Sequence, residues 1–296
     1  MANCEKSPSP KEQQVRLMIW TTPRTTSTAL TKCLSFVKDS KVFFEPYLTA
    51  YFMGPDKSVS PNERGDSYPA LKEEFVGWFD ASQCTYKWVK EQLEGTHDGK
   101  KFILCKDMAY TVSDRFAFLP ENYQHLVLIR NPLKVFPSWK ILFRQIRRVS
   151  MDEYELDKLP PGLFPEGRGY KEINDLIEYL KETRNQEVII IDADDLLQDP
   201  KGILSALFKV IGMPFEERLL SWEAGDAITR EWVVAKHCLE VNQVGHMYNT
   251  AFDSTCFTKP RPLPDRRSLS PDILRCVDAS IPYYNKMHAR RLTAEK

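Results

Sequence analysis

Apolar residues in this chain come in short continuous runs separated by segments of helical periodicity. Buried strands have this form, with polar or turn residues at their ends. The runs are VRLMIW (15–20), KVFFEP (41–46), KFILCK (101–106), HLVLIR (125–130) and EVIIID (187–192). Helical spacing occurs at 27–39, 68–80, 85–94, 132–148, 171–184, 201–212 and 271–292. Strands that alternate with helices predict an α/β fold, in which a central parallel sheet lies between two helical layers.

The N-terminal segment differs from the rest of the chain. Residues 1–14 are polar and contain Ser-Pro-Ser-Pro, which predicts a disordered tail before one folded domain at 15–296. The tail holds no apolar signal-peptide core, and no apolar run approaches the roughly 20 residues needed to cross a bilayer. The seven cysteines are scattered, without a C-x-x-C pair, so we expect neither disulfides nor a metal site. These features favour a cytoplasmic protein that does not bind membranes.

Charge is balanced over the whole chain but not along it. The 296 residues carry 41 basic and 41 acidic side chains, a net charge of zero, which argues against a protein that coats nucleic acid. Residues 130–148 nevertheless hold six basic side chains and no acid, and residues 259–296 hold nine basic and four acidic ones. Residues 149–200 hold five basic and fourteen acidic side chains. Two basic segments are therefore available for an anionic ligand.

The loop after the first predicted strand has the chemistry of a phosphate site. Ligands of parallel sheets bind beyond the carboxyl ends of the strands. There the sequence WTTPRTTSTAL leads directly into a helix, whose N-terminal N–H groups and positive dipole end suit an anion. Arg24 and the hydroxyls of residues 25–28 add further donors. Simple capping of the helix by Thr26 or Ser27 is the alternative. The loop is not a Walker A motif, because it lacks both glycines and the lysine.

A second cationic position follows the strand predicted at 125–130. Arg130 stands at its carboxyl end, and Ser138 lies eight residues later on the following helix. An arginine at such an edge can bind a phosphate bidentately. Arg144, Arg147 and Arg148 are better interpreted as a solvated basic face of that helix.

Together these two segments resemble the P-loop sulfotransferases. The family's 5′-phosphosulfate loop, P-[KR]-[ST]-G-T-T, is similar to PRTTST at 23–28, with Thr26 in place of the glycine. Its 3′-phosphate motif, R-[ND]-P followed by a helix serine, is matched by Arg130, Asn131, Pro132 and Ser138. IIIDADDLLQDP (189–200) resembles the family's later Y-E-D-L and D-P segment. PRTTSTAL, FFEPY and LLSWEAG (219–225) look most like bacterial-type sulfotransferase-like proteins of undefined acceptor.

The resemblance implies a donor, a reaction and a set of residues. The donor would be 3′-phosphoadenosine 5′-phosphosulfate (PAPS), with adenosine 3′,5′-bisphosphate (PAP) as product and no metal. A sulfuryl group would pass to a hydroxyl or amine of a small-molecule acceptor. Arg24 would stabilise the leaving oxygen, and Arg130 and Ser138 would bind the 3′-phosphate. The loop residues that would hold the 5′-phosphosulfate are Pro23, Arg24, Thr25, Thr26, Ser27 and Thr28.

The general base is open at this point. Cytosolic relatives carry K-x-H at a strand end, and here the pattern is Lys106-Asp107-Met108. Lys106 matches, but the histidine is absent. Other sulfotransferases use a glutamate after the second strand, as Glu45 is placed here. Glu45 is the first candidate, although it could instead cap the next helix or form an ion pair. Asp107 is the second candidate, and a histidine such as His237 or His246 is the third.

Two other functional classes compete with a sulfotransferase. A non-catalytic relative that binds a nucleotide or a partner would explain the missing loop glycine. It would also explain the missing C-terminal motif R-K-G-x-x-G-D-W-K, in whose place the chain has Lys259, Arg261, Arg266 and Arg267. A nucleotide kinase would need a Walker lysine and a carboxylate for magnesium. Only the carboxylate is available, from Asp192, Asp194 or Asp195.

Overall fold

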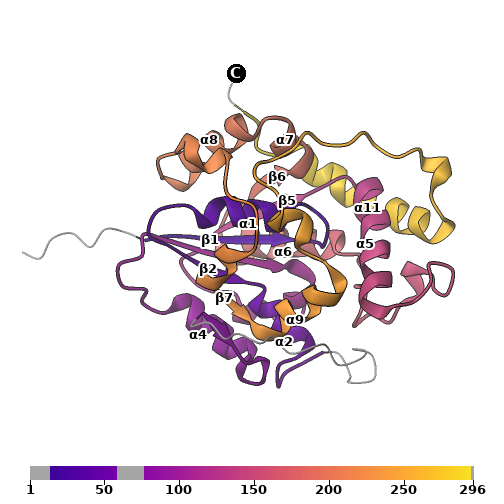
Figure 1. Cartoon of the computed structure of the whole chain (residues 1–296), viewed down its shortest axis with the longest axis horizontal. Helices are drawn as coiled ribbons and strands as arrows, with labels where there is room; N and C mark the ends of the chain where they lie inside the picture. The colour runs from indigo at the N-terminus through magenta and orange to yellow at the C-terminus, as the bar shows by residue number, and fades with distance from the viewer. Residues whose placement is uncertain (1–13, 59–76, 295–296) are drawn as a thin grey trace, which may run out of the picture.

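The computed structural model describes residues 14–58 and 77–294 (Figure 1). The described residues form one seven-stranded sheet in the order β3-β7-β2-β4-β1-β5-β6. Every pair of neighbouring strands is parallel. The strands are β1 Val15–Thr21, β2 Ser40–Phe44, β3 Trp78–Phe79, β4 Phe102–Met108, β5 Gln124–Ile129, β6 Ile189–Asp192 and β7 Trp232–Ala235. The predicted α/β class with a central parallel sheet is confirmed.

Helices cover both faces of this sheet. They are α1 Ser27–Ser35, α2 Pro46–Phe52, α4 Tyr86–Glu94, α5 Pro132–Arg147, α6 Tyr170–Arg184, α7 Ala193–Gln198, α8 Pro200–Ile211, α9 Lys236–Gly245, α10 Asn249–Phe252 and α11 Pro271–His288. Figure 1 shows α11 beside α5, and the extended segment that precedes α11 crosses the upper part of the molecule.

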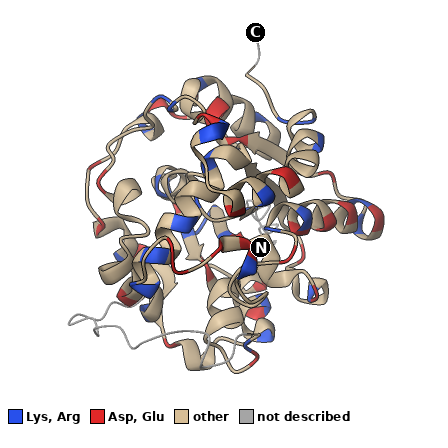
Figure 2. Ribbon diagram, turned by 90° about the vertical axis from the view of Figure 1, so that its right-hand side faces the viewer, with Lys and Arg blue, Asp and Glu red and all other residues tan. Residues whose placement is uncertain are grey.

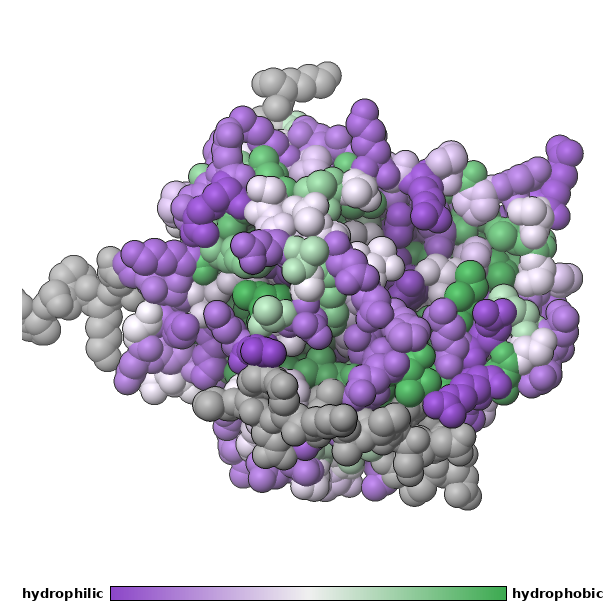
Figure 3. Space-filling model, in the orientation of Figure 1, coloured by the Kyte–Doolittle hydropathy of each residue, from purple (hydrophilic) through white to green (hydrophobic). Residues whose placement is uncertain are grey.

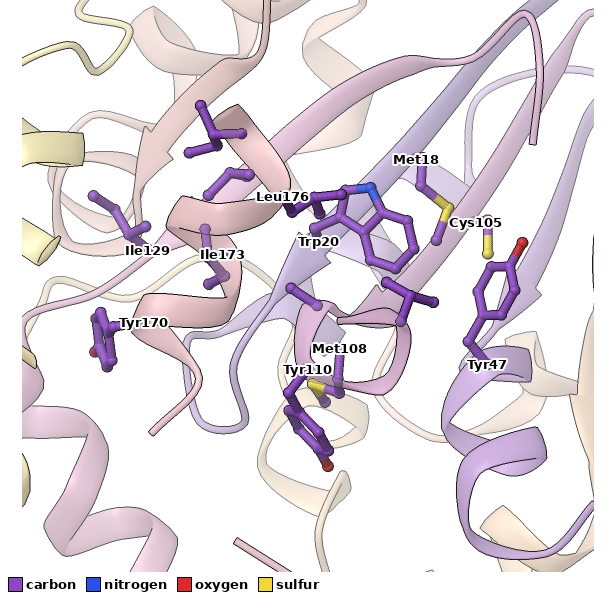
Figure 4. Packing of buried hydrophobic residues seen from close by; sticks show 14 of the residues in the cluster. Met18, Trp20, Tyr47, Cys105, Met108, Tyr110, Ile129, Tyr170, Ile173 and Leu176 are labelled. Atoms are coloured by element: carbon purple, nitrogen blue, oxygen red, sulfur yellow. The ribbon is translucent and has the colours of Figure 1, made fainter. Parts of the chain in front are cut away.

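Alternation along the strands divides the core into two clusters. Met18 and Trp20 of β1 belong to the cluster that also takes apolar residues from α2, α4, α5, α6 and α11. Leu17 and Ile19 belong to the cluster on the other face, with α1, α7, α8 and α9. Successive side chains of a strand point to opposite faces, so these continuously apolar strands are buried on both sides. Figure 4 shows the first cluster around Trp20.

The structure differs from the prediction in several segments and leaves two predicted segments untested. Residues 59–76, which hold most of the helix expected at 68–80, and residues 1–13 of the expected tail lie outside the described residues. Trp78–Phe79 form β3 and not a helix. The strand expected at 41–46 ends at Phe44, because Pro46 begins α2. The strand β7 was missed, since only four residues of it pair with the sheet.

The surface agrees with the neutral total charge. Basic and acidic residues alternate over the ribbon in Figure 2, and Figure 3 shows small hydrophobic areas between hydrophilic ones. Within residues 14–58 and 77–294, no helix combines the length and the apolarity that crossing a membrane requires. Cys33 and Cys105 are fully buried in the core, one on each face of the sheet.

Candidate active site

A cavity of about 650 Å³ opens beyond the carboxyl ends of the central strands. Its polar lining residues include Arg24 in the loop after β1, Ser27 and Thr28 at the start of α1, Glu45 directly after β2 and Lys106 near the end of β4. The rest of the lining is mainly apolar. Its residues include Leu48, Phe52, Met53, Met108, Tyr110, Trp139, Leu142, Phe143, Ile146, Leu163, Val241 and Met247.

The loop after β1 ends in a helix N-terminus without a side-chain cap. Thr26 is the residue before α1, and its hydroxyl accepts no hydrogen bond from the first turn. The free N–H groups and the dipole of such a turn can bind an anion. Thr26 has φ 70° and Arg24 has φ 72°, both in the left-handed region. Non-glycine residues rarely adopt it, and such conformations cluster at functional sites. The loop therefore has a glycine-like conformation without its glycine.

The four hydroxyl residues of this loop have different environments. The Thr25 hydroxyl is buried, where it contacts the Thr21 hydroxyl and donates to the Thr22 carbonyl at 3.1 Å. Ser27 and Thr28, like Pro23, line the cavity. Thr25 therefore holds the loop against β1, while Ser27 and Thr28 are available for a ligand.

Arg24 joins the two predicted phosphate motifs. Its Nε donates to Ser138 Oγ on α5 at 2.9 Å, and its Nη1 donates to the carbonyl of Met247 at 3.0 Å. Burial and the neighbouring Arg130 guanidinium lower the pKa of Arg24 from its ordinary value, although an arginine still stays charged. The first motif and Ser138 of the second are thus in direct contact.

Arg130 lies beside the loop rather than in the cavity wall. Its Nε donates to Asp194 Oδ1 at 3.1 Å, and the hydroxyl of Tyr170 donates to its carbonyl at 2.6 Å. Lys134 contacts the same Asp194 carboxylate and also the carbonyl of Arg261, which lies in the extended segment before α11. A carboxylate and two cations therefore meet where the 3′-phosphate is expected. The contact also brings the basic C-terminal segment to the same place.

Glu45 is held by two donors at the base of the cavity. Its side chain is 1% exposed, as is that of Lys106, and the Lys106 ammonium contacts Glu45 Oε1. The hydroxyl of Tyr248 donates to Glu45 Oε2 at 2.5 Å. Glu45 has φ 55°, and its side chain makes no capping bond to α2. The ion pair that the sequence allowed is present, and the capping role is not.

Asp107 caps α2 instead. Its carboxylate accepts hydrogen bonds from the backbone N–H groups of Tyr47 at 2.6 Å, Leu48 at 3.0 Å and Met108 at 2.8 Å. Burial, with the Glu45 charge adding to it, raises the pKa of Asp107 to about 8 against the effect of these bonds. The side chain is fully buried and does not line the cavity. Of these two carboxylates, Glu45 is the one that lines the cavity.

The histidine candidates are separated by the structure. His237 lines the cavity, and its Nδ1 lies 3.7 Å from Glu240 Oε2. His246, at the end of α9, is exposed. Tyr248 was not predicted at the site, because residues 225–258 carry no clear pattern. Within the described ranges, no cluster of three or more His, Cys, Asp or Glu side chains is arranged to hold a metal.

The strained loop makes a stability prediction. Replacement of Thr26 by glycine should raise the free energy of unfolding by about 0.5–1 kcal/mol, because the left-handed conformation costs a side chain more than glycine loses in the unfolded state. Thr26→Ala keeps the Cβ atom and should bring no gain. Urea unfolding of the three proteins measures the difference. Equal effects of the two substitutions would contradict the described loop conformation.

Part of the chain matches a known protein family. A family model described as a sulfotransferase domain matches residues 183–291, a little over a third of the chain. "Branched-chain-amino-acid aminotransferase-like protein 2" of Arabidopsis thaliana is 27% identical over 274 residues, which are 90% of this chain and 40% of that protein. The chain thus spans about two fifths of the length of the curated relatives that it matches.

Solved sulfotransferases are among the similar structures. The sulfotransferase from Alicyclobacillus acidocaldarius has 14% identity and a TM-score of 0.48, over 82% of this chain and 97% of that one. Mouse sulfotransferase SULT7A1, solved in complex with PAP, has 12% identity and a TM-score of 0.48, over 94% of this chain and 90% of that one. The family model supports the resemblance to sulfotransferases over residues 183–291, a region outside both phosphate motifs.

Proposed function

We propose that this chain transfers a sulfuryl group from PAPS to a hydroxyl or amine of a small-molecule acceptor. The observation that carries the proposal is the direct contact of Arg24 with Ser138, which joins the free N-terminus of α1 to the second basic motif. Ser27, Thr28 and the first N–H groups of α1 would bind the 5′-phosphosulfate. Arg130, Lys134 and Ser138 would bind the 3′-phosphate, which would compete with Asp194 for the two cations.

The reaction follows from the arrangement of charges. The acceptor oxygen or nitrogen forms a bond to sulfur while the bond from sulfur to the bridging phosphate oxygen breaks. Arg24 stabilises the charge that develops on that leaving oxygen. Glu45 takes the acceptor proton, and Lys106 holds the Glu45 carboxylate in place. PAP leaves with both phosphates.

The apolar side of the cavity suits the acceptor. It adjoins Glu45 and is formed largely by α2, α5 and α9. A small molecule with an apolar body and one hydroxyl or amine would bury its body there and direct its polar group to the carboxylate. A soluble enzyme that acts in the cytoplasm would be consistent with such a small-molecule acceptor.

The experiment that tests donor binding is a thermal titration with PAP. A ligand that binds only the folded state raises the unfolding midpoint, so PAP should raise it, and ATP with magnesium should raise it much less. Arg130→Ala should lower the apparent affinity for PAP at least tenfold, because the 3′-phosphate loses a charged hydrogen-bond partner. Arg144→Ala, at an exposed position of α5, the helix that follows Arg130, is the matched control.

The outcomes distinguish the classes. A response to ATP with magnesium and none to PAP would indicate a phosphoryl-transfer enzyme. PAP binding without any transfer would indicate the non-catalytic relative. Equal PAP affinity in Arg130→Ala and Arg144→Ala would remove Arg130 from the donor site.

A further inference from the structure

Tyr248 lies at the meeting point of the two halves of the candidate site. It follows α9 and precedes α10, outside both phosphate motifs. Its hydroxyl donates to Glu45 Oε2, and the carbonyl of the preceding residue, Met247, accepts from Arg24. Two consecutive residues therefore contact the arginine of the donor loop and the carboxylate at the acceptor side.

The surroundings of Tyr248 keep it in one place. Its side chain is 6% exposed, and its ring packs edge-on against Phe44 at 5.1 Å. Its backbone N–H donates to Asn242 Oδ1 at 2.9 Å. Four residues further along, the buried Lys32 ammonium of α1 donates to the carbonyl of Phe252. Burial and the Glu45 charge raise the pKa of Tyr248 well above its ordinary value, so the hydroxyl remains a donor.

The two donors hold different oxygens of the carboxylate. Lys106 contacts Oε1 and Tyr248 contacts Oε2. Rotation about the last bond of a glutamate is only weakly restricted, and one ammonium leaves that rotation free. A second donor fixes the plane of the carboxylate, and proton transfer depends on such alignment.

We infer that Tyr248 is a positioning residue, which orients Glu45 toward the acceptor through its hydroxyl. The inference rests on the proposed function for the role of Glu45. Loss of the hydroxyl should lower kcat about tenfold and leave the KM for PAPS and the affinity for PAP unchanged. The packing of the ring is a separate contribution, which phenylalanine retains.

A double-mutant cycle tests this role. Tyr248→Phe should lower kcat about tenfold in the wild-type background and less than twofold in the Glu45→Gln background, because its effect passes through Glu45. Tyr123→Phe is the matched control, since Tyr123 is equally buried and its hydroxyl donates to the Leu93 carbonyl away from the cavity. An equal loss of kcat in both backgrounds, or no loss, overturns the inference.

A second readout needs no turnover. Crystal structures of wild type and Tyr248→Phe should show the Glu45 carboxylate fixed in the first and rotated or in two conformers in the second. An unmoved carboxylate overturns the positioning role even if the enzyme is active. A rotated carboxylate in a protein that transfers no sulfuryl group supports the role and removes the proposed function, so the two failures are distinguishable.

Discussion

Replacement of Glu45 by glutamine is expected to lower kcat by about 10²–10⁴-fold, the usual contribution of a general base. The carboxylate lines the cavity, and its two oxygens are held by Lys106 and Tyr248. Glutamine is nearly the same size and keeps an oxygen for Lys106, but its amide does not take up a proton. Release of PAP from PAPS, in the presence of a small-molecule extract as the source of acceptor, measures the rate.

The control for Glu45→Gln is donor binding. Glu45 does not contact either phosphate motif, so PAP should raise the unfolding midpoint of the variant as much as that of wild type. Turnover equal to that of wild type would remove Glu45 as the base and direct attention to His237. If Glu45→Gln also loses PAP binding, the substitution has disrupted the whole site. Turnover and PAP binding of Glu45→Asp, which keeps the negative charge, are then compared with wild type instead.

Among the substitutions considered for stability, Asp272→Ala should lower the free energy of unfolding the most. Asp272 on α11 pairs with Lys140 on α5 at 2.9 Å, with side chains 3% and 6% exposed. It also accepts from the Leu156 N–H at 2.9 Å and from the Ser270 hydroxyl. Asp272→Ala leaves a buried ammonium without its partner, which costs about 3–5 kcal/mol. Denaturant unfolding should show this loss. Asp278 is also on α11, and Asp278→Ala, which breaks an exposed pair with Arg266 before that helix, should cost less than about 1 kcal/mol.

The pair of Asp272 and Lys140 also predicts how the free energy of unfolding changes at acidic pH. Burial alone would raise the pKa of Asp272, but the bonds from Leu156, Ser270 and Lys140 outweigh it and lower the pKa to about 2. Because folding lowers the pKa of Asp272, its ionised carboxylate stabilises the folded state at pH values above the ordinary carboxyl pKa. This stabilisation is lost as the pH falls from about 4 to about 2. The difference in unfolding free energy between wild type and Asp272→Ala should narrow over that range. A constant difference would show that the charge of Asp272 does not contribute.

The sequence predicts the strands that are buried on both faces, because their apolar runs leave no other place for them. It fails for β3 (WF) and β7 (WVVA), which are apolar but have only two and four residues. The site shows the same division. Arg24, Arg130 and Ser138 follow strands at one edge of a parallel sheet, so their meeting could be predicted. Tyr248 reaches the site through tertiary packing, which local patterns do not encode, whereas Asp194 follows β6 at the same edge of the sheet.

The two carboxylates near Lys106 show why roles are harder to predict than positions. Glu45 directly precedes Pro46 and α2, so a capping role was reasonable. The left-handed backbone at Glu45 turns its side chain to the cavity, and Asp107 of the adjacent strand caps α2 in its place. Which of the two carboxylates caps α2 and which lines the cavity depends on the backbone conformation at Glu45. The structure is needed to show that conformation.

Transfer of labelled sulfate tests the central claim most directly. The purified protein is incubated with PAPS that carries ³⁵S and with a small-molecule extract, and labelled organic products are separated and counted against the PAP released. The account predicts new labelled compounds in amounts equal to PAP, together with their loss in Glu45→Gln. Binding of PAP without any labelled product, or release of inorganic sulfate alone, would contradict it.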